Sequence, residues 1–192
     1  MNLAVVILAA GQSTRMKSEQ PKVLHPLAGK PMISYSVETA AQLSAGKPVL
    51  VVGHGMEQVR ETVGDGAEYV VQEKRLGTGH AVLQARPLLE GLCDTVLVTY
   101  ADMPLLTAET LRRLLALQAE GSGFIAMAML TLLAKDPRGF GRVVRDAEGR
   151  VLGVVEEVDC TPEQLAIREL NAGVYCFDGP WLWAHLPRLP LS

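Results

Sequence analysis

The sequence has few aromatic residues and no excess of positive charge. Only 5% of its 192 residues are aromatic whereas 48% are hydrophobic, so aliphatic side chains must fill the core of a chain long enough to bury most of its apolar surface. Lys and Arg total 18 against 21 for Asp and Glu, a formal net charge of −3. This balance argues against nucleic-acid or anionic-membrane partners, which favour a basic surface, but it permits a small phosphate pocket.

Cysteine pairs and long apolar runs are also missing. Cys93, Cys160 and Cys176 form no C-x-x-C motif, which disfavours zinc and redox sites and predicts buried thiols in a reducing compartment. No basic residue precedes the first apolar run at Leu3, so no signal peptide is expected, and the run 3–10 is too short to span a bilayer. We therefore expect a cytoplasmic protein without membrane insertion.

Two common nucleotide-binding motifs are absent as well. No G-x-x-x-x-G-K-[ST] loop occurs, and the dinucleotide fingerprint G-x-G-x-x-G would need glycine where Ser13 and Met16 stand. A nicotinamide-dependent oxidoreductase is therefore a distant interpretation.

Strand and helix patterns alternate over the first part of the chain. Buried-strand patterns occur at 3–8, 48–52, 69–71 and 95–99. Helical patterns lie between and after them, at 32–43, 56–63, 78–89 and 108–119, the last preceded by Thr107 as a candidate N-cap. This alternation predicts an α/β fold, a doubly wound, mostly parallel sheet with helices on both faces.

The pattern changes after about residue 122. Strand patterns follow at 124–133, 142–145, 150–155 and 173–177, with a hairpin turn at 146–149. The prolyl tail 186–192 is expected not to be helical. We therefore predict one domain over 1–192, with a nucleotide-binding half over about 1–122 and a smaller β-rich half over about 123–192.

The first candidate site motif is L-A-A-G-Q-S-T-R-M-K at 8–17, followed by Pro21 and Lys22. A strand that ends in a glycine turn exposes backbone N–H groups that can hold phosphate oxygens, and Gly11 permits close approach of a ligand. Arg15 and Lys22 add the positive charge that a triphosphate needs. Each residue alone has an ordinary structural explanation, but the combination favours phosphate binding.

The second motif is Tyr100-Ala101-Asp102 at the end of the fourth predicted strand. Ligands of open α/β sheets bind at such strand ends. A carboxylate facing a triphosphate suits Mg²⁺, which prefers oxygen ligands and shares its shell with phosphates. Asp102 could instead only begin a turn, but its pairing with the first loop favours a metal ligand.

The third motif is V-Q-E-K-R-L-G-T-G-H-A at 71–81. The amide of Gln72 carries a donor and an acceptor and can read the edge of a base. Gly77 allows close approach, and Thr78 opens a helix whose N-terminus favours an anion. His80 has no evident catalytic partner in the sequence and is interpreted as structural.

The fourth group lies in the β-rich half, at G-F-G-R (139–142), Glu156-Glu157 and L-N-A-G (170–173). Sugar hydroxyls need carboxylate and amide partners together with open backbone. Glu156 and Asn171, each at a predicted strand edge, supply them, although each alone could be an exposed polar residue.

Together these residues resemble the uridylyltransferase domain of the bacterial bifunctional N-acetylglucosamine-1-phosphate uridylyltransferase/glucosamine-1-phosphate acetyltransferases, from Leu3 to about Trp183. The first loop is shared by the wider sugar nucleotidyltransferase superfamily. The combination with Q-x4-G-T-G-H-A, Y-x-D, G-F-G-R, V-V-E-E and L-N-A-G is more specific to this family. The resemblance implies a Rossmann-like nucleotide-diphospho-sugar transferase fold with a smaller β-rich sugar-binding part. It also implies a role in UDP-N-acetylglucosamine biosynthesis for peptidoglycan and the cell wall.

The resemblance also implies a set of site residues. The uracil end would be contacted by Ala10, Gly11, Gln72 and Gly77, and the nucleotide site would be completed by Leu8, Ala9 and Tyr100. The catalytic residues would be Arg15, Lys22 and Asp102, with Asp102 as the Mg²⁺ ligand. N-acetylglucosamine and its surroundings would be bound by Thr78, Gly141, Glu156 and Asn171. The substrates would be UTP and N-acetylglucosamine 1-phosphate, and the products UDP-N-acetylglucosamine and pyrophosphate.

Three positions depart from the family pattern. Ala101 replaces a usual glycine and is expected to add a methyl group beside the nucleotide, while Ser13 replaces a common glycine in a way that relatives tolerate. The sequence ends at Ser192, before the family's second metal-ligand Asn and its β-helix. Acetyltransferase activity is therefore not predicted, an incomplete metal site is expected, and the family's trimer cannot be assumed.

Two alternatives to the uridylyltransferase interpretation stay open. One is a nucleotidyltransferase for another nucleotide or acceptor, such as molybdopterin, methylerythritol phosphate or a different sugar phosphate. The other is a nucleotide-sugar-binding fragment with little or no turnover.

Overall fold

The computed structural model describes residues 2–11, 18, 20–53, 55–120 and 123–190. The chain divides into two compact units. The first comprises Met1–Ala128 and Tyr175–Ser192, and the second comprises Met129–Val174.

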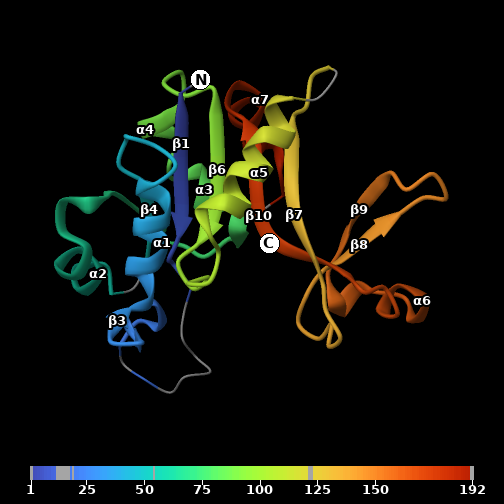
Figure 1. Ribbon diagram of the computed structural model, residues 1–192, viewed down its shortest axis with the longest axis horizontal. Coiled ribbons are helices and arrows are strands. Elements are labelled where there is room, and N and C mark those ends of the chain that lie inside the picture. Colours follow the sequence, from blue (N-terminus) through green and yellow to red (C-terminus); the bar gives the residue numbers. More distant parts are fainter. Residues whose placement is uncertain (1, 12–17, 19, 54, 121–122, 191–192) are drawn as a thin grey trace. The chain divides into compact units, whose positions relative to one another are not determined.

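The first unit is built on a sheet with strands in the order β5-β4-β1-β6-β10. These strands are β1 (Leu3–Leu8), β4 (Val49–Val52), β5 (Glu68–Val71), β6 (Thr95–Tyr100) and β10 (Glu169–Asp178). β1 is parallel to both β4 and β6, and β4 is parallel to β5, whereas the C-terminal part of β10 runs antiparallel to β6. The predicted mostly parallel, mixed sheet is therefore confirmed (Figure 1).

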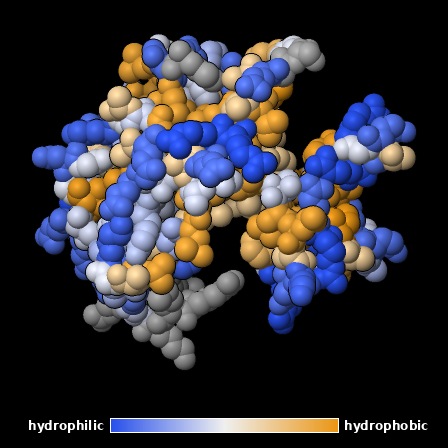
Figure 2. Space-filling model, in the orientation of Figure 1, coloured by the Kyte–Doolittle hydropathy of each residue, from blue (hydrophilic) through white to orange (hydrophobic). Residues whose placement is uncertain are grey.

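Helices cover both faces of this sheet, as predicted. Val6 and Leu8 of β1 pack with α3 (Gly77–Leu83) and α7 (Gly179–His185) in one buried cluster. Val5, on the opposite face, lies with residues of α1 (Met32–Ala41) and α5 (Ala108–Ala119). Figure 1 shows α1 and α5 in front of the strands, and Figure 2 shows mostly hydrophilic residues on their visible side. The continuous aliphatic run of β1 is thus explained, since it is buried from both sides.

Most predicted helices are present, and one is interrupted. α2 (Met56–Val63) and α5 have the predicted bounds, and the Thr107 hydroxyl oxygen caps α5 by accepting from the Thr110 N–H at 3.3 Å. The single helix predicted at 78–89 is wrong, because α3 ends at Leu83 and α4 occupies Arg86–Leu89. Pro87 explains the break, since it has no N–H to donate to the preceding turn but is tolerated in the first turn of a new helix.

Other differences lie at segment ends. The tail predicted to be non-helical contains a short 3-10 helix, Leu186–Arg188, with Pro187 in its first turn, where no N–H is required. β7 spans Met127–Leu133 instead of 124–133, and Phe124 is 71% exposed, so this aromatic residue does not belong to a buried strand. α7, capped by the Asp178 carboxylate, and the small sheet of β2 (Pro26–Leu27) and β3 (Lys30–Pro31) were not predicted.

The second unit is rich in β-structure. β8 (Arg142–Arg145) and β9 (Val151–Val155) form the predicted hairpin, and Leu170 near the start of β10 pairs with Arg142 of β8. The hairpin turn is held by the Asp146 carboxylate, which accepts from the N–H groups of Glu148 and Arg150 at 3.1 and 2.8 Å. A short helix, α6 (Pro162–Leu165), follows a 3-10 turn at Glu157–Asp159. The chain enters this unit along β7 and leaves it along β10, and these two strands pair.

All three cysteines carry free thiols. Cys176 is fully buried, and burial raises the pKa of its thiol to about 12. Cys93 and Cys160 are only partly buried, so the prediction that all three thiols are buried is wrong. Within the ranges that the structure describes, none of the helices has the length and apolar character needed to cross a lipid bilayer.

Candidate nucleotide and sugar sites

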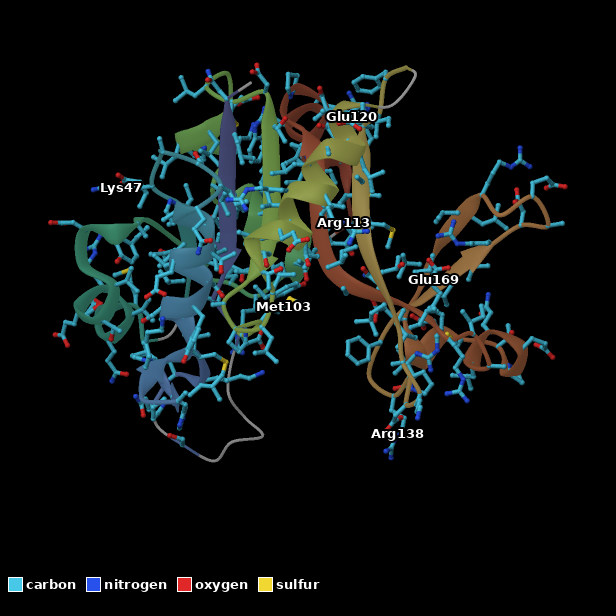
Figure 3. All side chains as sticks on the ribbon, in the orientation of Figure 1. Lys47, Met103, Arg113, Glu120, Arg138 and Glu169 are labelled. Carbon is cyan, nitrogen blue, oxygen red and sulfur yellow. The ribbon has the colours of Figure 1, made fainter. Side chains whose placement is uncertain are left out.

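A pocket of about 370 Å³ lies at the carboxyl ends of the parallel strands of the first unit. Its lining combines three of the predicted motifs. The residues that line it are Leu8, Ala9, Ala10, Gly11, Lys22, Val23, Gln72, Arg75, Gly77, Thr78, Ala81, Tyr100 and Asp102. Segments that are up to about 90 residues apart in the sequence meet here because parallel strands all end at the same edge of a sheet. Met103, labelled in Figure 3, marks the loop that follows β6 on this edge.

Lys22 and Asp102 face each other inside this pocket. The Lys22 Nζ lies 2.6 Å from the Asp102 Oδ2, and the two side chains remain 43% and 34% exposed. Lys22 begins a 3-10 turn, Lys22–Leu24, directly after Pro21. Gly55 makes room for this proline, because a Cβ on Gly55 would lie 2.5 Å from the Pro21 Cγ. The first and second sequence motifs therefore meet at one ion pair that a ligand can reach.

The end of β1 presents backbone to the pocket. The Ala9 N–H donates to the Val51 carbonyl at 2.8 Å, so the turn is anchored to β4. Among the described residues, no atom lies within 4 Å of the position that a Cβ would take on Gly11. Arg15, predicted to contact phosphate, and Ser13 lie outside the described residues.

Ala101 does not take the expected place. It is 0% exposed, and its N–H donates to the Leu8 carbonyl at 3.0 Å. Its side chain is therefore buried and does not line the pocket, so the expectation of a methyl group beside the nucleotide is wrong. Tyr100, by contrast, lines the pocket.

Gln72 and His80 form a polar cluster at one side of the pocket. Gln72 is 6% exposed, and its Nε2 donates to the Gly77 carbonyl at 3.1 Å and lies 3.0 Å from the His80 Nδ1. The Gln84 Nε2 lies 3.3 Å from the other ring nitrogen of His80. His80, interpreted from the sequence as structural, thus contacts a pocket side chain. Sequence reasoning also missed Arg75, a cation in the pocket lining.

The predicted sugar-binding residues of the second unit lie together. The Asn171 N–H donates to the Gly141 carbonyl at 2.9 Å. Gly141 is buried against Glu156, since a Cβ at Gly141 would lie only 3.2 Å from the Glu156 Oε1. Glu156 itself is exposed, and the Asn171 Oδ1 accepts from the Gly173 N–H at 2.9 Å. The Glu156 carboxylate and the backbone of Asn171 therefore both lie beside Gly141.

Arg142 and Glu157 hold the G-F-G-R loop in place. The Arg142 side chain is 2% exposed; it donates to the Phe140 carbonyl and lies 3.3 Å from the Glu157 Oε1. The other oxygen of Glu157 accepts from the Gly139 N–H at 2.8 Å. Neither residue was assigned a role from the sequence, although a charged residue at the start of an apolar strand was a visible signal. Arg138 of the same loop is 84% exposed (Figure 3).

Lowering the pH tests whether the Glu157 carboxylate stabilises this loop. The Gly139 N–H, and less strongly Arg142, lower the pKa of Glu157 from its ordinary 4.5. A carboxyl group whose pKa is lower in the folded state stabilises the fold above its unfolded pKa, and this contribution is lost as the pH falls through the folded pKa. We therefore expect the Tm of the wild type to fall more steeply below pH 4.5 than that of Glu157→Gln.

Thermal denaturation followed by circular dichroism from neutral to acidic pH measures this difference. Glu148→Gln is the matched control in the same unit, since Glu148 is an exposed carboxylate that forms an ion pair with Arg150 across 3.3 Å. Equal slopes for the wild type and Glu157→Gln would show that the carboxylate does not hold the loop.

A divalent cation fits the nucleotide pocket through Asp102. Over the described ranges, no cluster of three or more His, Cys, Asp or Glu residues is arranged to hold a metal by itself. Mg²⁺, however, is commonly bound by one or two carboxylates together with substrate phosphates. The ammonium group of Lys22, 2.6 Å from the Asp102 carboxylate, already occupies a cation position in this pocket. The Asp102 carboxylate is thus suited to bind a metal ion together with the phosphates of a triphosphate.

Curated relatives are similar over nearly the whole chain. The Bifunctional protein GlmU of Lactobacillus delbrueckii subsp. bulgaricus is 46% identical over 189 residues, which are 98% of this chain and 41% of the relative. That of Azotobacter vinelandii is 50% identical over 190 residues, 98% of this chain and 40% of the relative. That of Heliobacterium modesticaldum is 48% identical over 181 residues. The chain therefore spans about two fifths of the length of these relatives.

Solved structures support the fold. A CMP:2-keto-3-deoxy-manno-octonic acid synthetase complexed with CTP matches with a TM-score of 0.75 at 19% identity, over 100% of this chain and 80% of that chain. A 4-diphosphocytidyl-2C-methyl-D-erythritol synthase from Anaerococcus prevotii matches with a TM-score of 0.67 at 14% identity, over 97% and 75%. At these identities the likeness establishes the α/β nucleotidyltransferase fold alone.

A protein-family model matches the part of the chain that contains the pocket residues. The MobA-like NTP transferase domain matches residues 5–145, which include the β1 turn, Gln72 and Asp102. The chain therefore belongs to the MobA-like NTP transferase domain family and carries a nucleotidyltransferase domain.

Proposed function

We propose that the chain transfers UMP from UTP to N-acetylglucosamine 1-phosphate, giving UDP-N-acetylglucosamine and pyrophosphate. The observation that carries this proposal is the Lys22–Asp102 pair at 2.6 Å in a pocket that also contains Gln72 and the β1 turn. The similarity to GlmU proteins and the sequence motifs favour UTP and the amino sugar over other substrates. Because UTP is a cytoplasmic metabolite, we place the activity in the cytoplasm.

The reaction is an in-line displacement at phosphorus. A phosphate oxygen of the sugar phosphate forms a bond with the α-phosphorus of UTP while the bond from that phosphorus to the bridging oxygen of pyrophosphate breaks. The attacking phosphate is already anionic at neutral pH, so no general base is required. The protein must instead reduce the repulsion between two anions and stabilise the leaving pyrophosphate.

The residues of the first unit are proposed to supply charge and orientation. Lys22, together with Arg15, would contact the triphosphate, and Gln72 with the Gly77 backbone would orient the base. Mg²⁺ held by Asp102 and phosphate oxygens would supply the additional positive charge that pyrophosphate departure needs. Correct orientation of the reactants can lower such a barrier by about 7–11 kcal/mol.

Acceptor recognition is assigned to the second unit. Gly141, Glu156 and Asn171 are proposed to bind the N-acetylglucosamine part. Thr78 lines the pocket of the first unit and is proposed to contact substrate there. The hydrogen bonds of Glu157 with Gly139 and Arg142 support this assignment, because they fix the loop that carries Gly141. No covalent enzyme intermediate is involved.

Activity assays of the full chain with different pairs of nucleotide and sugar phosphate test the proposal. Pyrophosphate release would be measured with UTP, CTP or GTP, each with N-acetylglucosamine 1-phosphate or glucose 1-phosphate, in the presence of Mg²⁺, and products would be identified by mass spectrometry. We expect the highest rate for UTP with the amino-sugar phosphate. A faster reaction with another nucleotide or acceptor would replace this assignment. Calorimetric binding of UDP-N-acetylglucosamine without turnover would identify a nucleotide-sugar-binding protein instead.

A further inference from the structure

The side-chain amide of Gln72 is oriented by two acceptors. Its Nε2 donates to the Gly77 carbonyl at 3.1 Å, and since a carbonyl oxygen can only accept, this contact identifies the nitrogen end of the amide. The same nitrogen lies 3.0 Å from the His80 Nδ1. One N–H of the amide therefore points to Gly77, and the second points to His80.

The tautomer of His80 follows from its surroundings. A neutral imidazole has a single acceptor nitrogen, so only one of the two amide nitrogens beside the ring can donate to it. The Gln72 contact, at 3.0 Å, is shorter than the Gln84 contact, at 3.3 Å. The Gln84 Nε2 also has another acceptor, the His80 carbonyl at 2.9 Å. The acceptor nitrogen is therefore Nδ1, and the ring proton is on Nε2.

This arrangement leaves the Gln72 Oε1 for a ligand. Gln72 is buried and lines the pocket, and within the described part of the chain the hydrogen bonds of its side chain involve only Nε2. An acceptor at such a position requires a donor. Uracil presents an N–H at position 3 of its ring, whereas cytosine presents a bare acceptor nitrogen there. The amide, held in this orientation, would attract the first base and repel the second.

We propose that His80 is a positioning residue for nucleotide selection: by accepting from the Gln72 amide, it keeps Oε1 available for a base that carries an N–H donor. The inference rests on the proposed function, because it takes Gln72 as the residue that reads the base. To accept cytosine, the amide would have to rotate by half a turn. Its oxygen would then face the Gly77 carbonyl and the His80 Nδ1, and both hydrogen bonds would be lost.

Binding measurements on the full chain test this role. Dissociation constants for UTP and CTP, measured by isothermal titration calorimetry in the presence of Mg²⁺, would be compared for the wild type, His80→Phe and His80→Asn. In His80→Phe the preference for UTP over CTP is expected to fall about tenfold, since about one hydrogen bond no longer opposes amide rotation. His80→Asn, which can place an acceptor oxygen near the position of Nδ1, is expected to restore the preference.

His185→Phe is the matched control, because the His185 ring stacks on Trp181 and its Nδ1 lies 2.7 Å from the Trp181 carbonyl, and neither interaction involves Gln72. A His80→Phe variant that binds UTP with an unchanged preference over CTP would overturn the inference. So would an equal loss of affinity for both nucleotides, which indicates a purely structural role. A wild-type chain that fails to prefer UTP would instead contradict the proposed function, and with it this inference.

Discussion

Replacing Asp102 with asparagine is expected to reduce turnover of UTP about 10²–10³-fold, comparable to removing one electrostatic contact at a transition state. The amide has nearly the shape of the carboxylate but no negative charge, so it is a much weaker ligand for a divalent cation. The carboxylate now lies 2.6 Å from Lys22 within the pocket, and the variant removes this ion pair as well. We expect the loss to appear in kcat and in the Mg²⁺ concentration needed for half-maximal rate.

Initial rates of pyrophosphate release across a Mg²⁺ titration measure both quantities. Glu90→Gln is the matched control, because Glu90, directly after α4, also forms an ion pair, at 2.7 Å with Arg86, and neither residue lines the pocket. Near-normal rates and an unchanged Mg²⁺ requirement in Asp102→Asn would remove this residue from the proposed mechanism.

Replacing Lys22 with methionine is expected to lower kcat about 10²-fold or more, since one positive charge that balances the triphosphate is lost. The variant should also need less Mg²⁺ for half-maximal rate, because the lysine ammonium no longer competes for the Asp102 carboxylate. The two effects have opposite signs, so a general structural defect would not produce both.

Steady-state kinetics at several Mg²⁺ concentrations separate these effects. Lys30→Met is the appropriate control, because Lys30 also makes a 2.6 Å ion pair, with Glu38, away from the pocket lining. A Lys22→Met variant with unchanged kcat, or with a higher Mg²⁺ requirement, would contradict the assignment.

Much of the first unit follows from local sequence patterns. The aliphatic runs of β1 and β4 predict strands that are buried on both faces, and their parallel pairing with β5 and β6 places all the strand ends on one edge. That geometry is why Gln72 and Asp102 could be assigned to one pocket before any distance was known. The break between α3 and α4 was missed although Pro87 was visible, because a helical pattern of apolar residues continues through it.

What could not be predicted depends on contacts between distant side chains. The sequence places His80 eight residues after Gln72, but whether their side chains meet depends on how the loop returns to the end of β5. The burial of Arg142 is similar, since it requires both Glu157 and the Phe140 carbonyl as partners. Charged and polar residues with such partners are difficult to recognise from composition, which usually indicates that they are exposed.

The path of the chain between the two units has an evolutionary consequence. Residues 129–174 leave the first unit within β7 and return to it within β10, and all the residues that line the pocket of the first unit precede this segment. Recombination within these two strands would exchange this segment as a unit and leave the pocket of the first unit intact. On the proposed division of roles, descendants of one ancestral gene would change their acceptor through this segment without altering the pocket proposed to hold the nucleotide.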